Sequence, residues 1–475
     1  MMMNRIKAPV ALVAGTLLLS GCSDLLDVDN PNNLVEEAIQ QEAAANGVVN
    51  GALWHVSEAL GDVWEGPAVT SNELYWIGSG DAWGALDQGF ISDNLNEFTD
   101  AAFPNLGQAA WMAQNAVEIL EFHTAESASS ADFAVDRGRA YMMRGMVLMA
   151  IAEQQQDMTF SYKQTDGPPV SGGNAFLGLG TDYVPPVAVP SMAAVMVQAI
   201  TDLELAVSVF QAEGEASLEL DATALLMRAE MSEEIMTART SPCDGTVAGC
   251  AIDFADAVPY AQTVLMDGDA DYRFNLAFSA ASTNNNMAAN VNDRKENQID
   301  LSLVTVDASN DVNGINLQDV VDGTTDDPAL IQMLNQFKAG DYLSKGDQYS
   351  PLTVSGARLA HLVLAETAAA GGNTGGGTFV SHIQDLRAID SYPAAYAGGN
   401  EVATLVHHRR VNTVLQGLWL QDMYRWGLEP QVSEGTDAAS VWAPTASARS
   451  QELLPITIIE VRANCYLNSN PCPGG

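Results

Sequence analysis

The stretch of sequence that decides the fold is HRRVNTVLQGLWLQDMYRWG, which runs from His408 to Gly427. It sets Arg409, Arg410 and Asp422 among leucines, valines and tryptophans, which usually lie inside a protein. Charged groups persist in such surroundings when they are paired with an opposite charge. We therefore expect these three residues to form buried or half-buried ion pairs that fix helix packing.

Helical periodicity extends outward from this stretch over much of the chain. Apolar and small side chains recur on one face from Arg137 to Ala152, and again from Met196 to Phe210. Strand-like alternation is rare, and small residues inside the helices allow the close approach that stacked helical hairpins need. We therefore predict a mainly α-helical array of TPR-like hairpins. Similar helical segments begin near Glu36, Ala101, Thr223, Phe254, Ser355, Phe379 and Glu401.

Three stretches interrupt this helical pattern. Residues 166–190 carry five prolines and five glycines, which predicts a long loop, and residues 371–377 predict a glycine-rich linker. Residues 267–351 are rich in asparagine, which favours turns, and are expected to form a loop-rich insertion. The insertion separates an N-terminal helical region, residues 36–266, from a C-terminal helical region of the same fold, residues 352–475.

The N-terminal residues 1–21 are typical of a lipoprotein signal peptide. Arg5 and Lys7 precede an apolar run that is too short to span about 30 Å of hydrocarbon. A Ser-Gly pair then stands directly before Cys22, an ending that resembles the lipobox of bacterial lipoproteins. We expect acyl chains on Cys22 to anchor the protein to a membrane, with residues 22–35 as a polar tether. The alternative is an ordinary signal peptide followed by a chance cysteine.

The charge balance excludes one class of partner. The 475 residues contain 60 Asp and Glu against 20 Lys and Arg, a formal net charge of −40. A nucleic-acid-binding protein needs a basic stripe that follows the phosphates, so we expect no nucleic-acid partner. The same charge favours a neutral or cationic ligand over an anionic polysaccharide.

Four cysteines follow Cys22 and fall into two pairs with equal spacing. Cys243 and Cys250 flank one set of turn residues, and Cys465 and Cys472 flank another. An exported chain meets an oxidising compartment, so we expect two local disulfides. Free thiols or a metal site remain the alternative, although no metal-ligand spacing accompanies the cysteines.

Five segments, in this order along the chain, resemble the SusD/RagB family of nutrient-binding outer-membrane lipoproteins. The resemblance covers nearly the whole mature chain, and a Leu-Pro-Ile run at Leu454 completes it. It implies a SusD-like fold and a lipid-anchored, cell-surface position in the outer membrane. The five segments are residues 22–31, 139–145, 199–206, 357–368 and 408–427.

The last of these segments is the most specific. The family usually shows Glu-Arg-Arg, then Glu-Leu, then Glu-Gly, and finally an Asp-Leu-x-Arg-x-Gly run. This chain has His408, Asn412 and Gln416 where the family usually has acidic residues, which indicates a divergent branch. The positions that match are Arg409, Arg410, Gly417, Asp422, Arg425 and Gly427.

Strong catalytic signatures do not occur in this sequence. It has no phosphate-binding loop, zinc-peptidase motif or hydrolase elbow, and it predicts no catalytic residue, no cofactor and no metal site. The run that begins at Asp267 starts like a calcium loop, but Tyr272 replaces the required glycine and Phe278 the glutamate, so a plain turn is expected. His407 and His408 are weak catalytic candidates because the sequence shows no partner for either.

Aromatic residues concentrate between residues 64 and 98, in a stretch rich in Gly, Asp and Asn. Flat aromatic faces stack on sugar rings, and nearby amides and carboxylates hydrogen-bond hydroxyls. This composition predicts a loop that binds a neutral polar ligand, although packing in the core is the alternative for each residue. Trp54, inside the first helix, is expected in the core. The ligand-binding candidates are Trp64, Tyr75, Trp76, Asp81 and Trp83.

The resemblance implies a binding protein without catalytic activity. It would capture an oligosaccharide or peptide and deliver it to a SusC-like TonB-dependent outer-membrane transporter. Two alternatives remain open. One is a surface glycoside hydrolase that uses paired carboxylates in the aromatic cleft, and the other is a helical-repeat scaffold for assembly.

Overall fold

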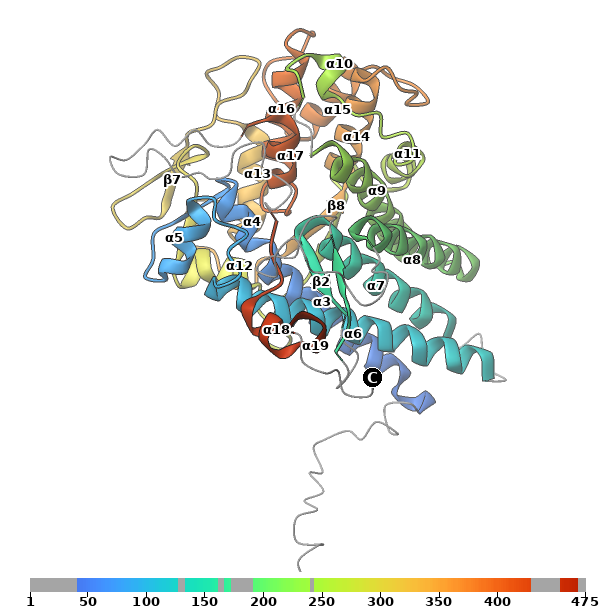
Figure 1. Ribbon diagram of the computed structural model, residues 1–475. Coiled ribbons are helices and arrows are strands. Elements are labelled where there is room, and N and C mark those ends of the chain that lie inside the picture. The colour runs from blue at the N-terminus through green and yellow to red at the C-terminus, as the bar shows by residue number, and fades with distance from the viewer. Residues whose placement is uncertain are drawn as a thin grey trace, which may run out of the picture. The chain divides into compact units, whose positions relative to one another are not determined.

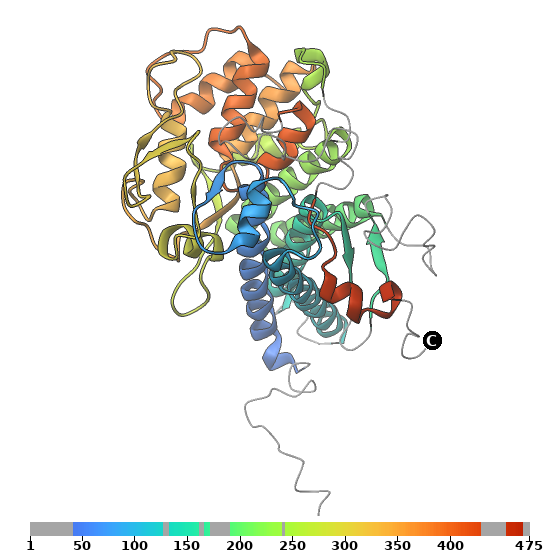
Figure 2. The same ribbon diagram turned by 60° about the vertical axis from the view of Figure 1, so that its left-hand side comes forward.

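Long helices form where the sequence has a 3.6-residue period. The computed structural model describes residues 41–126, 133–160, 166–171, 191–239, 243–428 and 453–468. A 3-10 turn at Glu42–Ala44 precedes the long helices, and each helix from α6 to α9 packs against the next (Figures 1 and 2). The predicted mainly α-helical array is confirmed. These helices are α3 (Ala45–Val63), α6 (Glu97–Glu126), α7 (Ala134–Gln154), α8 (Met192–Glu213) and α9 (Ala216–Ala238).

Glycines allow α7 and α8 to approach closely. A Cβ placed on Gly145 would lie 2.7 Å from Cγ of Leu203, and one on Gly138 would lie 2.7 Å from the ring of Phe210. Both distances are shorter than real carbon contacts. Small residues inside the helix are therefore required by the packing, as the sequence predicted.

α8 is bounded by two standard caps. The hydroxyl of Ser191 accepts a hydrogen bond from the backbone N–H of Ala194, and Gly214 ends the helix with a left-handed φ of +74°. Among the described residues, α8 alone is long and apolar enough to cross a membrane by length and composition. Its buried face packs against α7 and α9, and its other face is exposed.

The array continues through the second half of the chain. α9 packs on α11, α11 on α14 and α14 on α15, and α16 packs against both α13 and α14 (Figure 1). The bounds are α11 (Val258–Asp267), α13 (Pro328–Phe337), α14 (Ala357–Ala369), α15 (Phe379–Ile389), α16 (Glu401–Asn412) and α17 (Trp419–Trp426). Shorter helices are α4 (Glu65–Thr70), α5 (Asp81–Asp87), α10 (Val247–Cys250), α12 (Asn286–Ala288), α18 (Ile458–Ala463) and α19 (Cys465–Asn468), and a π-helical turn spans Ala289–Asp293.

The strands form four small antiparallel pairs, each of two strands. Residues 267–351 hold β4 to β7, α12, the π-helical turn and α13, with loops between them. The pairs are β1 (Leu74–Trp76) with β5 (Asn297–Ile299), β2 (Asp157–Thr159) with β3 (Pro169–Ser171), β4 (Arg273–Leu276) with β8 (Leu352–Gly356), and β6 (Val304–Val306) with β7 (Val312–Ile315).

Buried ion pairs hold α14, α16 and α17 together. Asp422 is fully buried and accepts from Nε of Arg409 at 2.9 Å and from Nε of Arg425 at 2.7 Å. Arg425 also pairs with the buried carboxylate of Glu366 on α14. The predicted ion pair of Arg409 and Asp422 is confirmed. The prediction was wrong for Arg410, which forms no ion pair with another described residue. Arg410 is half-buried, donates to Oγ of Ser302 at 2.6 Å and lies over the ring of Trp419.

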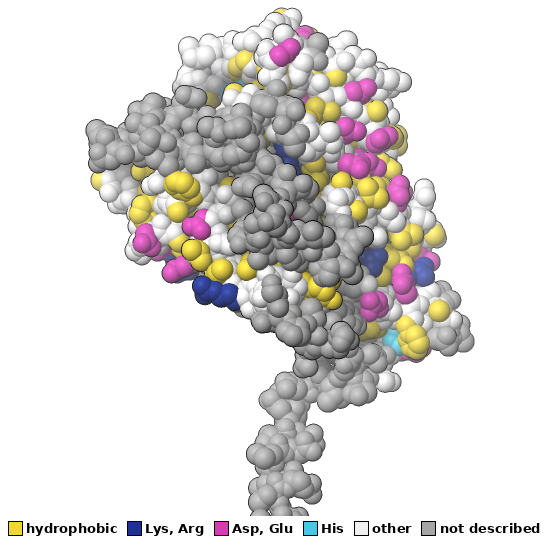
Figure 3. Space-filling model, viewed as in Figure 1, with side chains coloured by type: hydrophobic (Ala, Val, Ile, Leu, Met, Phe, Trp, Pro, Cys, Tyr) yellow, Lys and Arg dark blue, Asp and Glu magenta, His cyan; other side chains and the backbone are white. Residues whose placement is uncertain are grey.

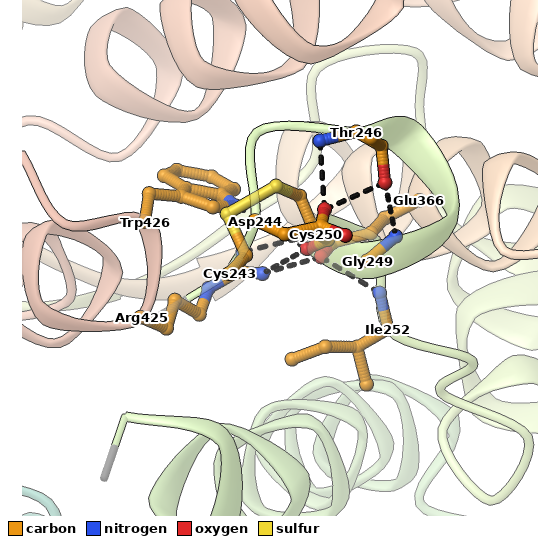
Figure 4. Close-up of a disulfide and its surroundings, with 9 residues drawn as sticks. All are labelled: Cys243, Asp244, Thr246, Gly249, Cys250, Ile252, Glu366, Arg425 and Trp426. Atoms are coloured by element: carbon orange, nitrogen blue, oxygen red, sulfur yellow. Dashed lines mark hydrogen bonds and ion pairs between the residues drawn. A yellow bond between two sulfur atoms is a disulfide. The ribbon is translucent and has the colours of Figure 1, made fainter. Parts of the chain in front are cut away.

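The predicted disulfide between Cys243 and Cys250 is present, with the two Cα atoms 4.8 Å apart. Figure 4 shows it beside the end of α17. The backbone N–H of Cys243 donates to the carbonyl of Arg425 at 2.8 Å, and Nε1 of Trp426 donates to the carbonyl of Cys250 at 3.3 Å. The disulfide loop is thereby attached to the buried ion pairs.

Several predictions fall wholly or partly on residues that the structure does not describe. Cys465 takes part in a disulfide, but Cys472 lies outside the described residues, so their pairing stays a prediction. The signal peptide (1–21), Cys22, the tether (22–35) and most of the loop at 166–190 also lie outside them.

Two buried carboxyls flank α4: Glu65 begins this helix, and Glu73 lies between it and β1. Glu65 accepts from the side-chain amides of Asn290 and Asn297, each at 2.8 Å, and Glu73 accepts from the backbone N–H of Leu415 at 2.9 Å. Burial raises the pKa of both Glu65 and Glu73 to about 8, although these hydrogen bonds act to lower it. Both groups are therefore protonated at neutral pH in the folded chain.

These two groups predict that stability falls as the pH rises from about 5 to 8. In this window the folded state keeps the proton on Glu73 while the unfolded state loses it, so the folded state binds more protons. Each such group lowers the free energy of unfolding by about 1.4 kcal/mol per pH unit. Glu73→Gln keeps an oxygen to accept from Leu415 and removes one titration. Urea denaturation from pH 5 to 8 should give a slope that is shallower by about that amount, whereas parallel slopes would contradict the assignment.

Acidic side chains are spread over the α8, α9 and α11 side of the face drawn in Figure 3. Burial and the charges of Asp256, Glu233, Glu204 and Glu234 raise the pKa of Glu230 on α9 to about 7. The large net negative charge is thus concentrated enough on this surface to affect an individual carboxyl.

Candidate functional site

The structure contradicts the prediction that Trp64 binds a ligand. Trp64 is fully buried where α3 meets α4, with the guanidinium of Arg228 4.6 Å from its ring centroid. Gly417 approaches the indole so closely that a Cβ there would lie 2.7 Å from Cδ1. A side chain enclosed in this way has no free face for a sugar, so Trp64 belongs to the core.

Trp83 is also a core residue, which corrects the second prediction. It is only 3% exposed and stacks on Phe98 with ring centroids 4.0 Å apart. Trp76 is half-buried, and its ring lies so close to α5 that a Cβ on Gly84 would be 3.0 Å from it. Much of the aromatic segment therefore packs against itself rather than opening as a loop.

Tyr75 and Asp81 remain exposed and stay candidates. Tyr75 is 38% exposed on β1, and Asp81 is the first residue of α5. Trp54, which the sequence placed in the core, is 37% exposed and donates from Nε1 to the carbonyl of Ser282 at 3.1 Å. The expectation for Trp54 was wrong because its position on α3 faces this loop instead of a neighbouring helix.

A large opening runs along α6, and we call it the α6 groove. It consists of two cavities of about 380 and 580 Å³ that share Gly107 and Trp111 as lining residues. Both volumes lie in the range of ligand pockets. The first cavity is completed by residues 159, 457, 459 and 460, and the second by α7, α8 and residues 160 and 170. None of the five predicted ligand-binding residues lines it.

The face of α6 determines what the groove presents. Phe103, Gly107, Trp111 and Gln114 recur at helical spacing and line one side. Trp111 is partly exposed, and its Nε1 has no hydrogen-bond partner within the described part of the chain. A Cβ on Gly107 would meet only Cε of Met158, at 3.8 Å, so this glycine leaves the groove open.

Three polar residues of the second cavity's lining, Gln114, Arg144 and Gln198, belong to a hydrogen-bonded network that includes the buried Asp202. Asp202 on α8 accepts two hydrogen bonds of 2.6 Å from Arg144 and one of 3.0 Å from Gln198. Arg144 also donates to Oε1 of Gln114 at 2.8 Å. Opposing charge and hydrogen bonds keep Arg144 protonated, and its pKa is raised despite burial. These side chains are held in place before any ligand arrives.

The first cavity carries one carboxylate among its described lining residues, Glu460 of α18. Its Oε1 accepts from Thr159 at 2.7 Å and from Asn464 at 2.8 Å. The hydroxyl of Thr457 is buried nearby and has no partner among the described residues. The groove therefore offers an indole face on which a sugar can stack. Its amides, hydroxyls and single charged groups can hydrogen-bond the sugar's hydroxyls.

A third cavity, of about 480 Å³, lies beside α16 and is lined by His407, Arg410 and Trp419. Nε2 of His407 lies 2.7 Å from Oδ2 of Asp327, which also accepts from Tyr392 and caps α13. Trp419 is only 5% exposed, and Arg410 lies over its ring, so its indole offers little surface to a ligand. We therefore take the α6 groove as the candidate site.

Comparisons with known proteins were made by sequence and by structure. No family model matches the chain, and no curated protein matches it.

Solved structures do match, along most of the chain. A SusD superfamily protein from Bacteroides vulgatus has a TM-score of 0.58 at 13% identity and covers 91% of this chain and 98% of its own. A second SusD superfamily protein from the same organism has a TM-score of 0.56 at 16% identity, with 88% and 97% covered. A laminarin-binding SusD-like protein has a TM-score of 0.52 at 14% identity, with 89% and 98% covered. These likenesses establish a SusD-like fold.

Proposed function

We propose that this chain, which has the SusD-like fold, belongs to the SusD/RagB family and binds an oligosaccharide in the α6 groove. The observation that carries the proposal is Trp111, a partly exposed indole that lines both cavities of the groove. Sugar rings present flat C–H faces that stack on indoles. The carbohydrate-binding function of a structural neighbour, a laminarin-binding SusD-like protein, supports the same class of ligand.

The polar groups of the groove fit a neutral glycan. Arg144 and Gln198 are donors held by Asp202, and Arg144 also donates to Gln114. Glu460 and Thr159 line the first cavity. Such groups hydrogen-bond sugar hydroxyls without requiring a charge on the ligand. The net charge of −40 further disfavours an anionic polysaccharide.

Binding without catalysis is the function that this geometry favours. A glycoside hydrolase needs two carboxylates that flank the scissile bond. Among its described lining residues, the groove has only one carboxylate, Glu460, whose Oε1 accepts from Thr159 and Asn464. The alternative function, a helical-repeat scaffold for assembly, does not account for an open groove with pre-arranged polar groups.

The test is equilibrium binding to a panel of soluble glycans, with analysis of the products. The panel should include laminarin, other neutral polysaccharides, an anionic polysaccharide and unrelated peptides. The proposal predicts binding to at least one neutral glycan, with the glycan recovered intact. Cleavage products, or binding to peptides but to no glycan, would contradict it.

We further propose that the protein is anchored to the outer membrane through Cys22 and delivers its ligand to a SusC-like TonB-dependent transporter. The signal sequence and the fold support this role. Cys22→Ala removes the only thiol that the lipobox offers, so the variant should leave the membrane fraction. Fractionation and immunoblotting measure this shift, and a variant that remains with the membrane would contradict the lipid anchor.

A further inference from the structure

Three metal-ligating side chains meet between α14 and α15, away from the α6 groove. His361 lies on α14, and His382 and Asp385 lie three residues apart on one face of α15. The two helices pack side by side in both views (Figures 1 and 2). One ligand atom from each of the three residues lies within 4.8 Å of the others. We propose that His361, His382 and Asp385 bind a divalent transition-metal ion of the zinc type.

The surroundings of His382 prepare it as a ligand. Its Nε2 lies 3.2 Å from the carbonyl of Gly376, and a carbonyl oxygen can only accept. Nε2 therefore carries the proton, and Nδ1 keeps the lone pair that a metal needs. Gly377 has a left-handed φ of +85°, and a Cβ there would lie 2.7 Å from Nε2. The close loop thus fixes the ring, as backbone carbonyls do for many metal-binding histidines.

His361 also has an unsatisfied ring nitrogen. Its Nδ1 is buried and has no hydrogen-bond partner among the described residues. Burial lowers the pKa of His361 to about 4 and also lowers that of His382, so both rings are neutral at pH 7. Asp385 opposes both shifts, which shows that its charge acts on each histidine. A neutral imidazole is the form that ligates a metal.

The ligand set indicates the class of ion. Two imidazoles and one carboxylate suit Zn²⁺ and neighbouring first-row ions, and three protein ligands leave a position for water. Calcium and magnesium prefer sites made of oxygen ligands. A bound ion would join α14 to α15 across the glycine-rich loop between them and raise the stability of this helical pair.

The experiment is calorimetric titration of the purified, untagged chain with ZnCl₂ after removal of metals with EDTA. The proposal predicts one ion per chain and an increase in Tm with zinc. Asp385→Asn and His361→Gln should each weaken binding at least tenfold. Asp385 is exposed, so its amide variant should keep the fold, which circular dichroism checks. His55→Gln is the matched control, since His55 belongs to no such group among the described residues.

A second readout uses Co²⁺ in place of Zn²⁺. Ligation by this set predicts visible absorption bands in the native chain that weaken in His361→Gln and persist in His55→Gln. The proposal is overturned if the native chain binds no zinc, or if Asp385→Asn and His361→Gln bind it with native affinity. Both results are independent of glycan binding, because none of the three residues lines the α6 groove.

Discussion

Asp422→Ala is expected to lower the free energy of unfolding by about 3–5 kcal/mol, the cost of breaking a buried ion pair. Asp422 is fully buried and accepts from Arg409 and Arg425. Removing it leaves the guanidinium of Arg409 buried, with Sδ of Met231 as its remaining side-chain partner among the described residues. Arg425 keeps its pair with Glu366, so most of the loss arises at Arg409. Such a loss is a large share of the roughly 5–15 kcal/mol that stabilises a typical protein.

A matched control is available at the surface. Asp136 pairs with Arg139 at 3.0 Å, but both side chains are partly exposed. Exposed pairs contribute about 0–1 kcal/mol, so Asp136→Ala should change stability very little. Urea denaturation of both variants measures the difference. Equal losses in the two variants would show that α14, α16 and α17 do not depend on their buried ion pairs.

The helical array could be predicted from the sequence because its signals are local. The apolar faces of α7 and α8 recur every three to four residues, and Gly145 marks the place where the helices approach. The pairing of Arg409 with Asp422 was also predictable, since both lie within one short apolar stretch. Local spacing therefore contained most of the fold.

The site could not be predicted in the same way, because it depends on contacts between distant residues. The residues that follow Trp64 in the sequence have the composition of a binding loop. In the structure, however, Gly417, which is far along the chain, packs against the ring of Trp64. Trp111 stands alone in a long helix, and the walls of its groove come from α7, α8 and α18. The one signal in the sequence was a tryptophan on a helix face with Gly107 and Gln114.

Trp111→Ala is expected to cause a large loss of affinity for the glycan. Aromatic residues at the centre of a binding site typically cost about 2 kcal/mol or more when truncated, which is about 30-fold in affinity. Trp111→Ala removes the indole that both cavities share. Gly107→Leu should weaken binding by a different route, because the new side chain fills the open space beside that indole. Neither change touches a buried ion pair, so circular dichroism and Tm should remain close to native values.

The central claim is that an oligosaccharide binds in the α6 groove rather than on the exposed part of the aromatic segment. Its most direct test is calorimetric titration of Trp111→Ala and Tyr75→Ala with the glycan that the native chain binds best. We predict that Trp111→Ala weakens binding about 30-fold or more, while Tyr75→Ala stays within about threefold of native affinity. Native affinity in Trp111→Ala, or a loss confined to Tyr75→Ala, would contradict the assignment of the site.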